Sequence, residues 1–199
     1  MRNRVQLALV LATSMACSDD SGPTGSGEGC RGYPAQATSV YLLPFDLGRA
    51  FRVTQGNCSG GMRTHRVQGP FQYAYDFDMA KGTVVRAARG GEVIAVVEFF
   101  PDGTRRVGDE NYVLIRHTDG TFGRYFHLAL NGASVVHGQF VAQGDVIGFS
   151  GDSGNSTGPH LHFDVAICAD VGCLTLPIVF RNTRPHPNGL AEGQTYSAD

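Results

Sequence analysis

The chain has 199 residues and a formal net charge of −2 at pH 7, with 16 lysines and arginines against 18 aspartates and glutamates. This balance provides no broad basic surface for a nucleic-acid backbone, so we expect no nucleic-acid partner. Beyond the N-terminal segment, no apolar run is long enough to cross a bilayer as a helix.

Residues 1–16 have the pattern of a secretory signal peptide. Arg2 and Arg4 give a basic start, and a largely apolar stretch follows from Val5 to Ala16. The stretch is too short to span a bilayer, but it matches the hydrophobic region of a signal that is removed on export. We therefore expect an exported protein that faces the periplasm or the cell wall.

Cys17 stands where bacterial lipoproteins carry their acylated N-terminal cysteine. An aliphatic residue usually lies three positions earlier, where this chain has Ser14, so secretion after cleavage by a general signal peptidase stays the alternative. Residues 18–29 contain no bulky apolar side chain, and such a composition predicts a flexible tether. We expect residues 17–29 to anchor the protein to the membrane and residues 30–199 to form one monomeric domain.

The cysteines predict two disulfides. Of the five cysteines, four remain if Cys17 carries lipid, and an even number in an oxidising compartment favours pairing. Cys168 and Cys173 bracket a short turn, and we expect Cys30 to pair with Cys58. A cysteine zinc site is the weaker alternative because no Cys-x-x-Cys motif occurs.

The middle of the chain predicts a mainly β, antiparallel domain. Glycines separate short runs of β-branched and aromatic residues, and two Asp-Gly pairs, at 102–103 and 119–120, suit tight hairpin turns. Sustained helical periodicity is absent after the signal, so helix should be minor. In chain order, the predicted strands are 71–78, 84–88, 92–99, 112–117, 122–128, 146–149 and 161–167.

The last predicted strand carries the pattern His-Leu-His. Side chains alternate across a strand, so His160 and His162 share one face while Leu161 and Phe163 point into the core. Two adjacent imidazoles suggest metal chemistry, although a polar outer face is the ordinary explanation for an isolated His-x-His. Asp164 falls on the same face and can orient one of the rings.

Further candidate residues lie upstream. Alternation in strand 71–78 turns Asp76 and Asp78 away from four aromatic side chains. In strand 122–128 it buries Phe126 and Leu128 and turns His127 and Tyr125 to the opposite side; the hydroxyl of Tyr125 could serve the site, although packing is its commoner role. His65 lies in a loop. No other candidate residue accompanies His117, His137 or His186 in a motif, and we predict that these three histidines are structural or exposed.

Zinc binds imidazole nitrogen and carboxylate oxygen, and a catalytic zinc keeps three protein ligands and leaves the fourth position to water. A histidine, an aspartate and a second histidine would satisfy this requirement. With all these motifs in place, the chain resembles the lysostaphin-like (LytM-type) zinc endopeptidases, which cut peptidoglycan cross-bridges. The resemblance runs in order from about His65 to Val165, and its most specific part is Gly-Pro-His-Leu-His-Phe at 158–163.

The resemblance implies a compact antiparallel β fold with Zn²⁺ at the floor of a groove. It assigns the metal to His65, Asp76 and His162, and catalysis to His127 and His160. Asp76 is preferred to Asp78 because of its spacing before Gly82. Many members place the first histidine four residues before the aspartate, where this chain has Gln72, so His65 is assigned to that role from a longer loop.

The predicted function is an exported, zinc-dependent endopeptidase that cleaves stem peptides or cross-bridges of bacterial peptidoglycan with a zinc-activated water. Of His127 and His160, one would take a proton from water and the other would assist the oxyanion or the leaving amine; their order stays open. One alternative, which Gln72 would favour, is a non-catalytic wall-binding module or an activator of other hydrolases. Another is an exported metal-binding protein without hydrolytic activity.

Overall fold

A computed structural model describes residues 30–59 and 64–199 of the chain. The predicted signal peptide, the acylation of Cys17 and the whole of the tether therefore lie outside the described residues. Within them, the only helix is a single 3-10 turn, Gln36–Thr38, and no helix is long and apolar enough to cross a membrane. The expected mainly β fold is confirmed.

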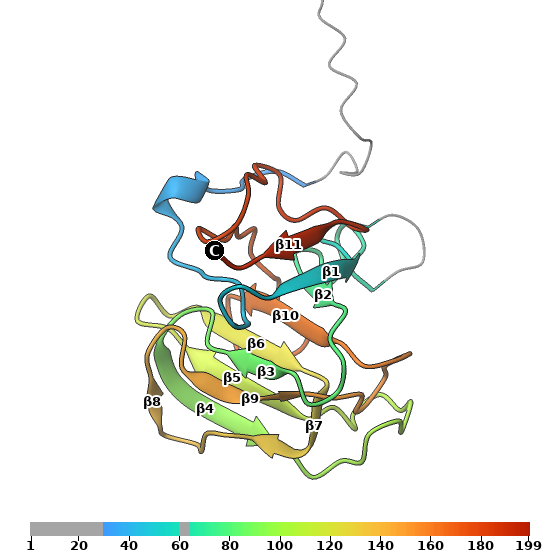
Figure 1. Cartoon of the computed structure of the whole chain (residues 1–199). Helices are drawn as coiled ribbons and strands as arrows, with labels where there is room; N and C mark the ends of the chain where they lie inside the picture. The colour runs from blue at the N-terminus through green and yellow to red at the C-terminus, as the bar shows by residue number, and fades with distance from the viewer. Residues whose placement is uncertain (1–29, 60–63) are drawn as a thin grey trace, which may run out of the picture.

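The strands form two antiparallel sheets (Figure 1). The large sheet has the order β11-β1-β2-β10-β6-β5-β4-β8, and the small sheet has the order β3-β9-β7. The strands are β1 Ala50–Gln55, β2 Tyr75–Phe77, β3 Val84–Arg86, β4 Gly91–Val97, β5 Tyr112–Arg116, β6 Phe122–Phe126, β7 Leu128–Ala133, β8 Phe140–Val141, β9 Val146–Ser150, β10 Leu161–Ala166 and β11 Thr195–Ser197.

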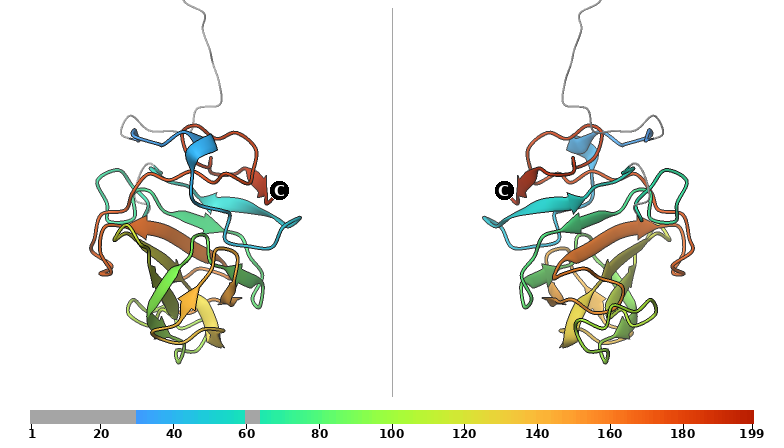
Figure 2. Two further views of the ribbon diagram at one scale, coloured as in Figure 1. Left: turned by 90° about the vertical axis from the view of Figure 1, so that its left-hand side faces the viewer. Right: turned by 90° about the vertical axis from the view of Figure 1, so that its right-hand side faces the viewer.

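One hydrophobic core joins the two sheets. Val85 of β3, Ile147 of β9 and Leu128 of β7 pack in the same buried cluster as Val113 and Ile115 of β5. The views in Figure 2 show the strands of the lower half curling around this shared interior. At the other end, the first described residues lie beside the last part of the chain, where Gln36 donates a hydrogen bond to the Thr183 carbonyl at 2.7 Å.

The seven predicted strands correspond to β2, β3, β4, β5, β6, β9 and β10. The strands predicted at 84–88 and 92–99 end two residues early, and two further differences affect the site. The strand predicted at 71–78 begins only at Tyr75, because residues 70–73 form turns. The strand predicted at 122–128 is broken at His127, whose φ of 63° lies in the left-handed region. Four strands, β1, β7, β8 and β11, were not predicted; β8 and β11 span two and three residues, too short for a visible alternation.

The break at His127 also reverses the predicted faces of β6. Tyr125, expected on the side of His127, is fully buried against Phe163, and its hydroxyl accepts the Ala88 N–H at 2.8 Å. Phe126, expected in the core, instead lies beside His162, with ring centroids 5.6 Å apart. Tyr125 therefore supports the core, and the suggestion that it adds a hydroxyl to the site was wrong.

Both predicted cysteine pairs lie at disulfide distance. The Cα atoms are 6.0 Å apart for Cys30 and Cys58, and 5.8 Å apart for Cys168 and Cys173. The amide nitrogen of Gln72 lies against the first pair, 3.8 Å and 3.7 Å from the two sulfurs. The first pair brings the start of the domain next to the segment after β1.

We predict that Cys30→Ser lowers the free energy of unfolding by about 3 kcal/mol, because this bridge closes a long loop. Cys168→Ser should cost less, since its loop is far shorter, with a sequence separation of 5 against 28. Denaturant unfolding of the oxidised proteins and non-reduced peptide mapping measure both points. Free thiols at Cys30 and Cys58 in the native protein would contradict the pairing.

Candidate metal centre and catalytic groove

A groove of about 940 Å³ runs over the face of the large sheet that is turned away from the core. Asp76, His127, His160 and His162 line it together. His65 lies beneath this lining and is fully buried. The structure therefore brings all five histidine and aspartate candidates to one place, although they come from widely separated parts of the chain.

Three of these residues point one ligand atom each at a common centre. His65 Nε2 lies 3.2 Å from His162 Nδ1 and 3.4 Å from Asp76 Oδ1, and His162 Nδ1 lies 2.9 Å from Asp76 Oδ1. Nitrogen and oxygen ligands of a tetrahedral zinc, each about 2.0–2.1 Å from the metal, are about 3.3 Å apart. The spacing of the three atoms therefore fits a tetrahedral metal site.

Strand pairing places two of the three donors. β10 pairs with β2 so that His162 stands directly opposite Asp76, and opposite residues of an antiparallel pair project from the same face. Leu161 and Phe163 point into the core as predicted. His65 arrives from the segment between β1 and β2, where its ring Nδ1 lies 3.3 Å from the Gly56 carbonyl.

Hydrogen bonds set which ring nitrogen faces the centre. A carbonyl can only accept, so Nδ1 of neutral His65 donates to Gly56 and Nε2 keeps its lone pair. His162 has the opposite arrangement, because its Nε2 lies 3.1 Å from Asp164 Oδ2 and its Nδ1 faces Asp76. Both neutral rings thus present an unprotonated nitrogen to the same point beside a carboxylate, as a bound metal requires.

His127 and His160 stand next to this centre without belonging to it. Their ring centroids are 4.5 Å apart, and His160 Nε2 lies 3.8 Å from Asp76 Oδ1. Each Nδ1 lies 2.8 Å from a backbone carbonyl, that of Ser153 for His127 and that of Gly158 for His160. In the neutral rings Nε2 is therefore the proton acceptor.

The environment separates the pKa values of these groups. Burial, reinforced by the charges of His160 and His162, lowers the pKa of His127 to about 3. Burial opposes the charged form of His162, but hydrogen bonds to Asp164 and Asp76 outweigh it and raise its pKa to about 9. Burial likewise opposes the Asp76 carboxylate, yet the neighbouring His65 and His162 hold its pKa well below the usual range.

Gly151 joins the segments of the two flanking histidines, and sequence analysis missed it. Its N–H donates to the His127 carbonyl at 2.8 Å, and its own carbonyl accepts the His160 N–H at 3.2 Å. A Cβ at this position would collide with the backbone of Ala129. Only glycine allows this close approach, and a single sequence offers no signal that marks Gly151 among 27 glycines.

Several other candidates lie outside the centre. Asp78 is exposed and lines the groove, but it is not part of the converging group. His117 and His186 are buried and contact backbone groups, and His137 is exposed, as expected for structural or solvent-facing residues. The second group of possible ligands in the described residues, around Asp170, contains Cys168 and Cys173, whose sulfurs face each other at disulfide distance.

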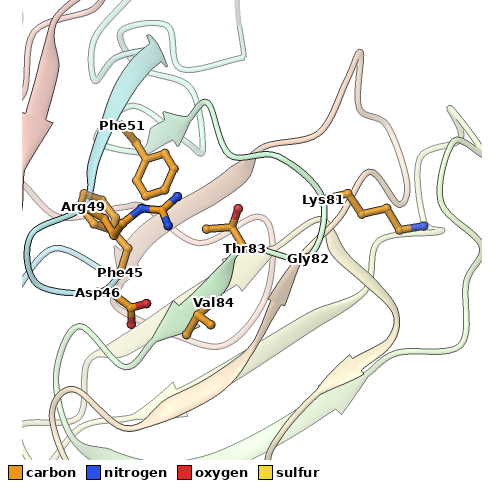
Figure 3. A pocket seen from close by; sticks show the side chains of 8 residues that line it. All are labelled: Phe45, Asp46, Arg49, Phe51, Lys81, Gly82, Thr83 and Val84. Carbon is orange, nitrogen blue, oxygen red and sulfur yellow. The ribbon is translucent and has the colours of Figure 1, made fainter.

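A smaller hollow of about 250 Å³ lies apart from the groove, around Arg49 and Thr83 (Figure 3). Arg49 stacks on Phe51, 5.5 Å from its ring centroid. Lys81 points away from the other lining residues and pairs with Asp102 at 2.6 Å. This hollow brings no second histidine cluster together among its lining residues.

Comparison with known sequences identifies the family. Residues 70–171 match the model of Peptidase family M23. The chain belongs to this family. The resemblance to lysostaphin-like enzymes is thereby confirmed, and the matched range includes four of the five candidate residues but begins after His65.

The relatives of this M23 chain are peptidases. It is 34% identical over 97 residues to lysostaphin of Staphylococcus staphylolyticus, covering 49% of this chain and 19% of that protein. It is 37% identical over 92 residues to the peptidoglycan DD-endopeptidase ShyA of Vibrio cholerae, covering 46% and 19%. The chain spans about a quarter or less of the length of such curated relatives.

A solved structure supports the same fold. The crystal structure of a zinc containing peptidase from Vibrio cholerae superposes with a TM-score of 0.51 at 29% sequence identity, covering 70% of this chain and 39% of that one. The similarity extends over most of the described domain.

The raised pKa of His162 predicts a pH-dependent metal affinity. Between its ordinary value of 6.5 and about 9, a metal must displace a proton, so zinc affinity should rise about tenfold per pH unit and level off above pH 9. In the metal-free protein, the same shift contributes stability that is complete below pH 6.5 and is lost as the pH rises through 9. Chelator competition across this range measures the affinity, and a constant affinity would contradict the prediction.

Proposed function

We propose that this M23 protein is an exported, zinc-dependent endopeptidase that cleaves peptide cross-bridges of bacterial peptidoglycan. The observation that carries the proposal is the convergence of His65 Nε2, Asp76 Oδ1 and His162 Nδ1 beside a second histidine pair, at the floor of an open groove. A relative named as a peptidoglycan DD-endopeptidase supports this substrate class. A neighbour named as a zinc containing peptidase supports this metal.

In this proposal, His65, Asp76 and His162 hold the zinc ion. When bound, zinc polarises the scissile carbonyl and lowers the pKa of water toward 7. The protein provides a fixed set of donors, since all three side chains are buried. His65 and His162 hold the pKa of Asp76 well below its usual range, so its carboxylate stays charged even without metal.

The two flanking histidines divide the proton transfers. His127 is held neutral by its depressed pKa, and its Nδ1 is occupied by the Ser153 carbonyl, so its Nε2 is the candidate to take a proton from the attacking water. The His160 ring is partly open to the groove. It is therefore the candidate to donate a proton to the leaving amine.

The wider setting is also part of the proposal. A signal at residues 1–16, a lipid at Cys17 and a tether to residue 29 would let a membrane-anchored monomer reach the wall. The two cysteine pairs would form disulfides in that oxidising compartment. Zinc binding and disulfide formation do not compete, because the proposed zinc donors are nitrogen and oxygen atoms and no cysteine is among them.

The non-catalytic alternative has less support. It depended on Gln72 replacing the first histidine, but the Gln72 side chain lies against the sulfurs of Cys30 and Cys58, and its carbonyl oxygen accepts the Gln68 N–H at 2.9 Å. His65 lies at the centre instead. A pure binding module would also have no chemical need for His127 and His160.

We predict that the zinc-loaded full chain lowers the cross-linking of purified peptidoglycan, seen as cross-linked fragments replaced by uncross-linked ones after the glycan strands are digested, and that chelator abolishes this change. His127→Ala and His160→Ala should each retain one zinc yet lose about 10² to 10⁴ in rate, as expected for a positioned acid or base. His137→Ala, which alters an exposed histidine, is the matched control and should be fully active. Product masses identify the cleaved bond.

Two outcomes would contradict the assignment. Zinc loss from His160→Ala as large as that from His162→Ala would exchange their roles. Intact peptidoglycan after incubation with protein that carries one zinc per chain would reject the endopeptidase and favour the metal-binding alternative.

A further inference from the structure

A fully buried ion pair lies directly behind the metal-facing ring of His162. Arg124 of β6 and Asp164 of β10 are both without solvent exposure. The Arg124 guanidinium donates two hydrogen bonds to the Asp164 carboxylate, from Nε to Oδ1 at 2.6 Å and from Nη2 to Oδ2 at 2.9 Å. The same Oδ2 accepts the Nε2 proton of His162 at 3.1 Å.

The remaining guanidinium nitrogen reaches the groove wall. Arg124 Nη1 donates to the Asp170 carbonyl at 2.6 Å, within the loop between Cys168 and Cys173. Val171 of that loop lines the groove. One guanidinium thus connects the carboxylate behind His162 to a wall of the groove in which substrate would lie.

Stability alone does not account for a pair in this position. Two buried charges lose their hydration, and a protein in which well-packed apolar residues replace a buried ion pair is often equally or more stable. A histidine ring, by contrast, can offer either nitrogen to a metal, and an acceptor behind it decides which. Strand pairing fixes this acceptor, because Arg124 stands opposite Asp164 just as Phe126 stands opposite His162.

We propose that Arg124 and Asp164 are positioning residues. Asp164 keeps the proton of neutral His162 on Nε2 and so aims Nδ1 at His65 and Asp76, while Arg124 holds Asp164 in place and fastens the Cys168–Cys173 loop. The metal ligand and this groove wall are then set by one buried interaction. The inference rests on the metal centre of the proposed function, but it does not depend on the substrate.

The test uses the full chain with its disulfides formed and zinc as the probe. Asp164→Ala removes the acceptor, and the double variant Arg124→Met, Asp164→Leu removes both charges so that none is left buried alone. The double variant Arg86→Met, Asp46→Leu removes a partly buried ion pair outside the groove and serves as the control. Zinc affinity is measured by chelator competition, and the ring protonation of His162 by nitrogen NMR.

We expect both variants at Asp164 to bind zinc about 10- to 100-fold more weakly, the usual effect of losing a partner behind a ligand. The control should bind as the native protein does. In the zinc-bound native protein, the His162 proton should sit on Nε2 and exchange slowly with water. In the folded variants it should exchange rapidly.

Native affinity in a folded double variant would overturn the proposal. A proton on Nδ1 of His162 in the native zinc protein would overturn it as well, and this measurement requires no variant. Both readouts need no peptidoglycan, so a chain that binds zinc as proposed but cleaves nothing would reject the endopeptidase and leave the positioning role intact.

Discussion

The antiparallel register between β2 and β10 is the constraint on which the site depends. It sets His162 opposite Asp76, and the same strand sends Leu161 and Phe163 into the core. Because side chains alternate, a slip of one residue would bury the histidine and expose the apolar residues. The hydrophobic core therefore fixes which side chains share the polar face, and the register places the two proposed ligands opposite each other.

The other edge of β10 adds the support. Its pairing with β6 sets Arg124 opposite Asp164. Of three neighbouring strands, β2 carries the proposed ligand Asp76, β10 carries the proposed ligand His162 with the Asp164 carboxylate, and β6 carries the arginine that pairs with this carboxylate. The chain then leaves β6 through the positive φ of His127, which lets two consecutive residues, Phe126 and His127, both line the groove. A regular strand would have sent one of them to the core.

Much of this could be predicted from sequence, and the failures have physical causes. The alternation of side chains along a strand correctly predicted that His160 and His162 project from the same face, because β10 is regular. It failed for Tyr125 and Phe126, since alternation says nothing about a backbone break at a histidine. Arg124 was missed because a charged residue in a strand normally faces solvent, and its burial depends on a partner 40 residues away.

X-ray absorption at the zinc edge, on the full chain loaded with one zinc, tests the central claim most directly. The account predicts two imidazole nitrogens, one carboxylate oxygen and a further light-atom ligand, with one imidazole lost in His65→Ala. Sulfur scattering would point to the group around Asp170 that includes Cys168 and Cys173. Two imidazoles still bound in His65→Ala would likewise contradict a centre built on His65, Asp76 and His162.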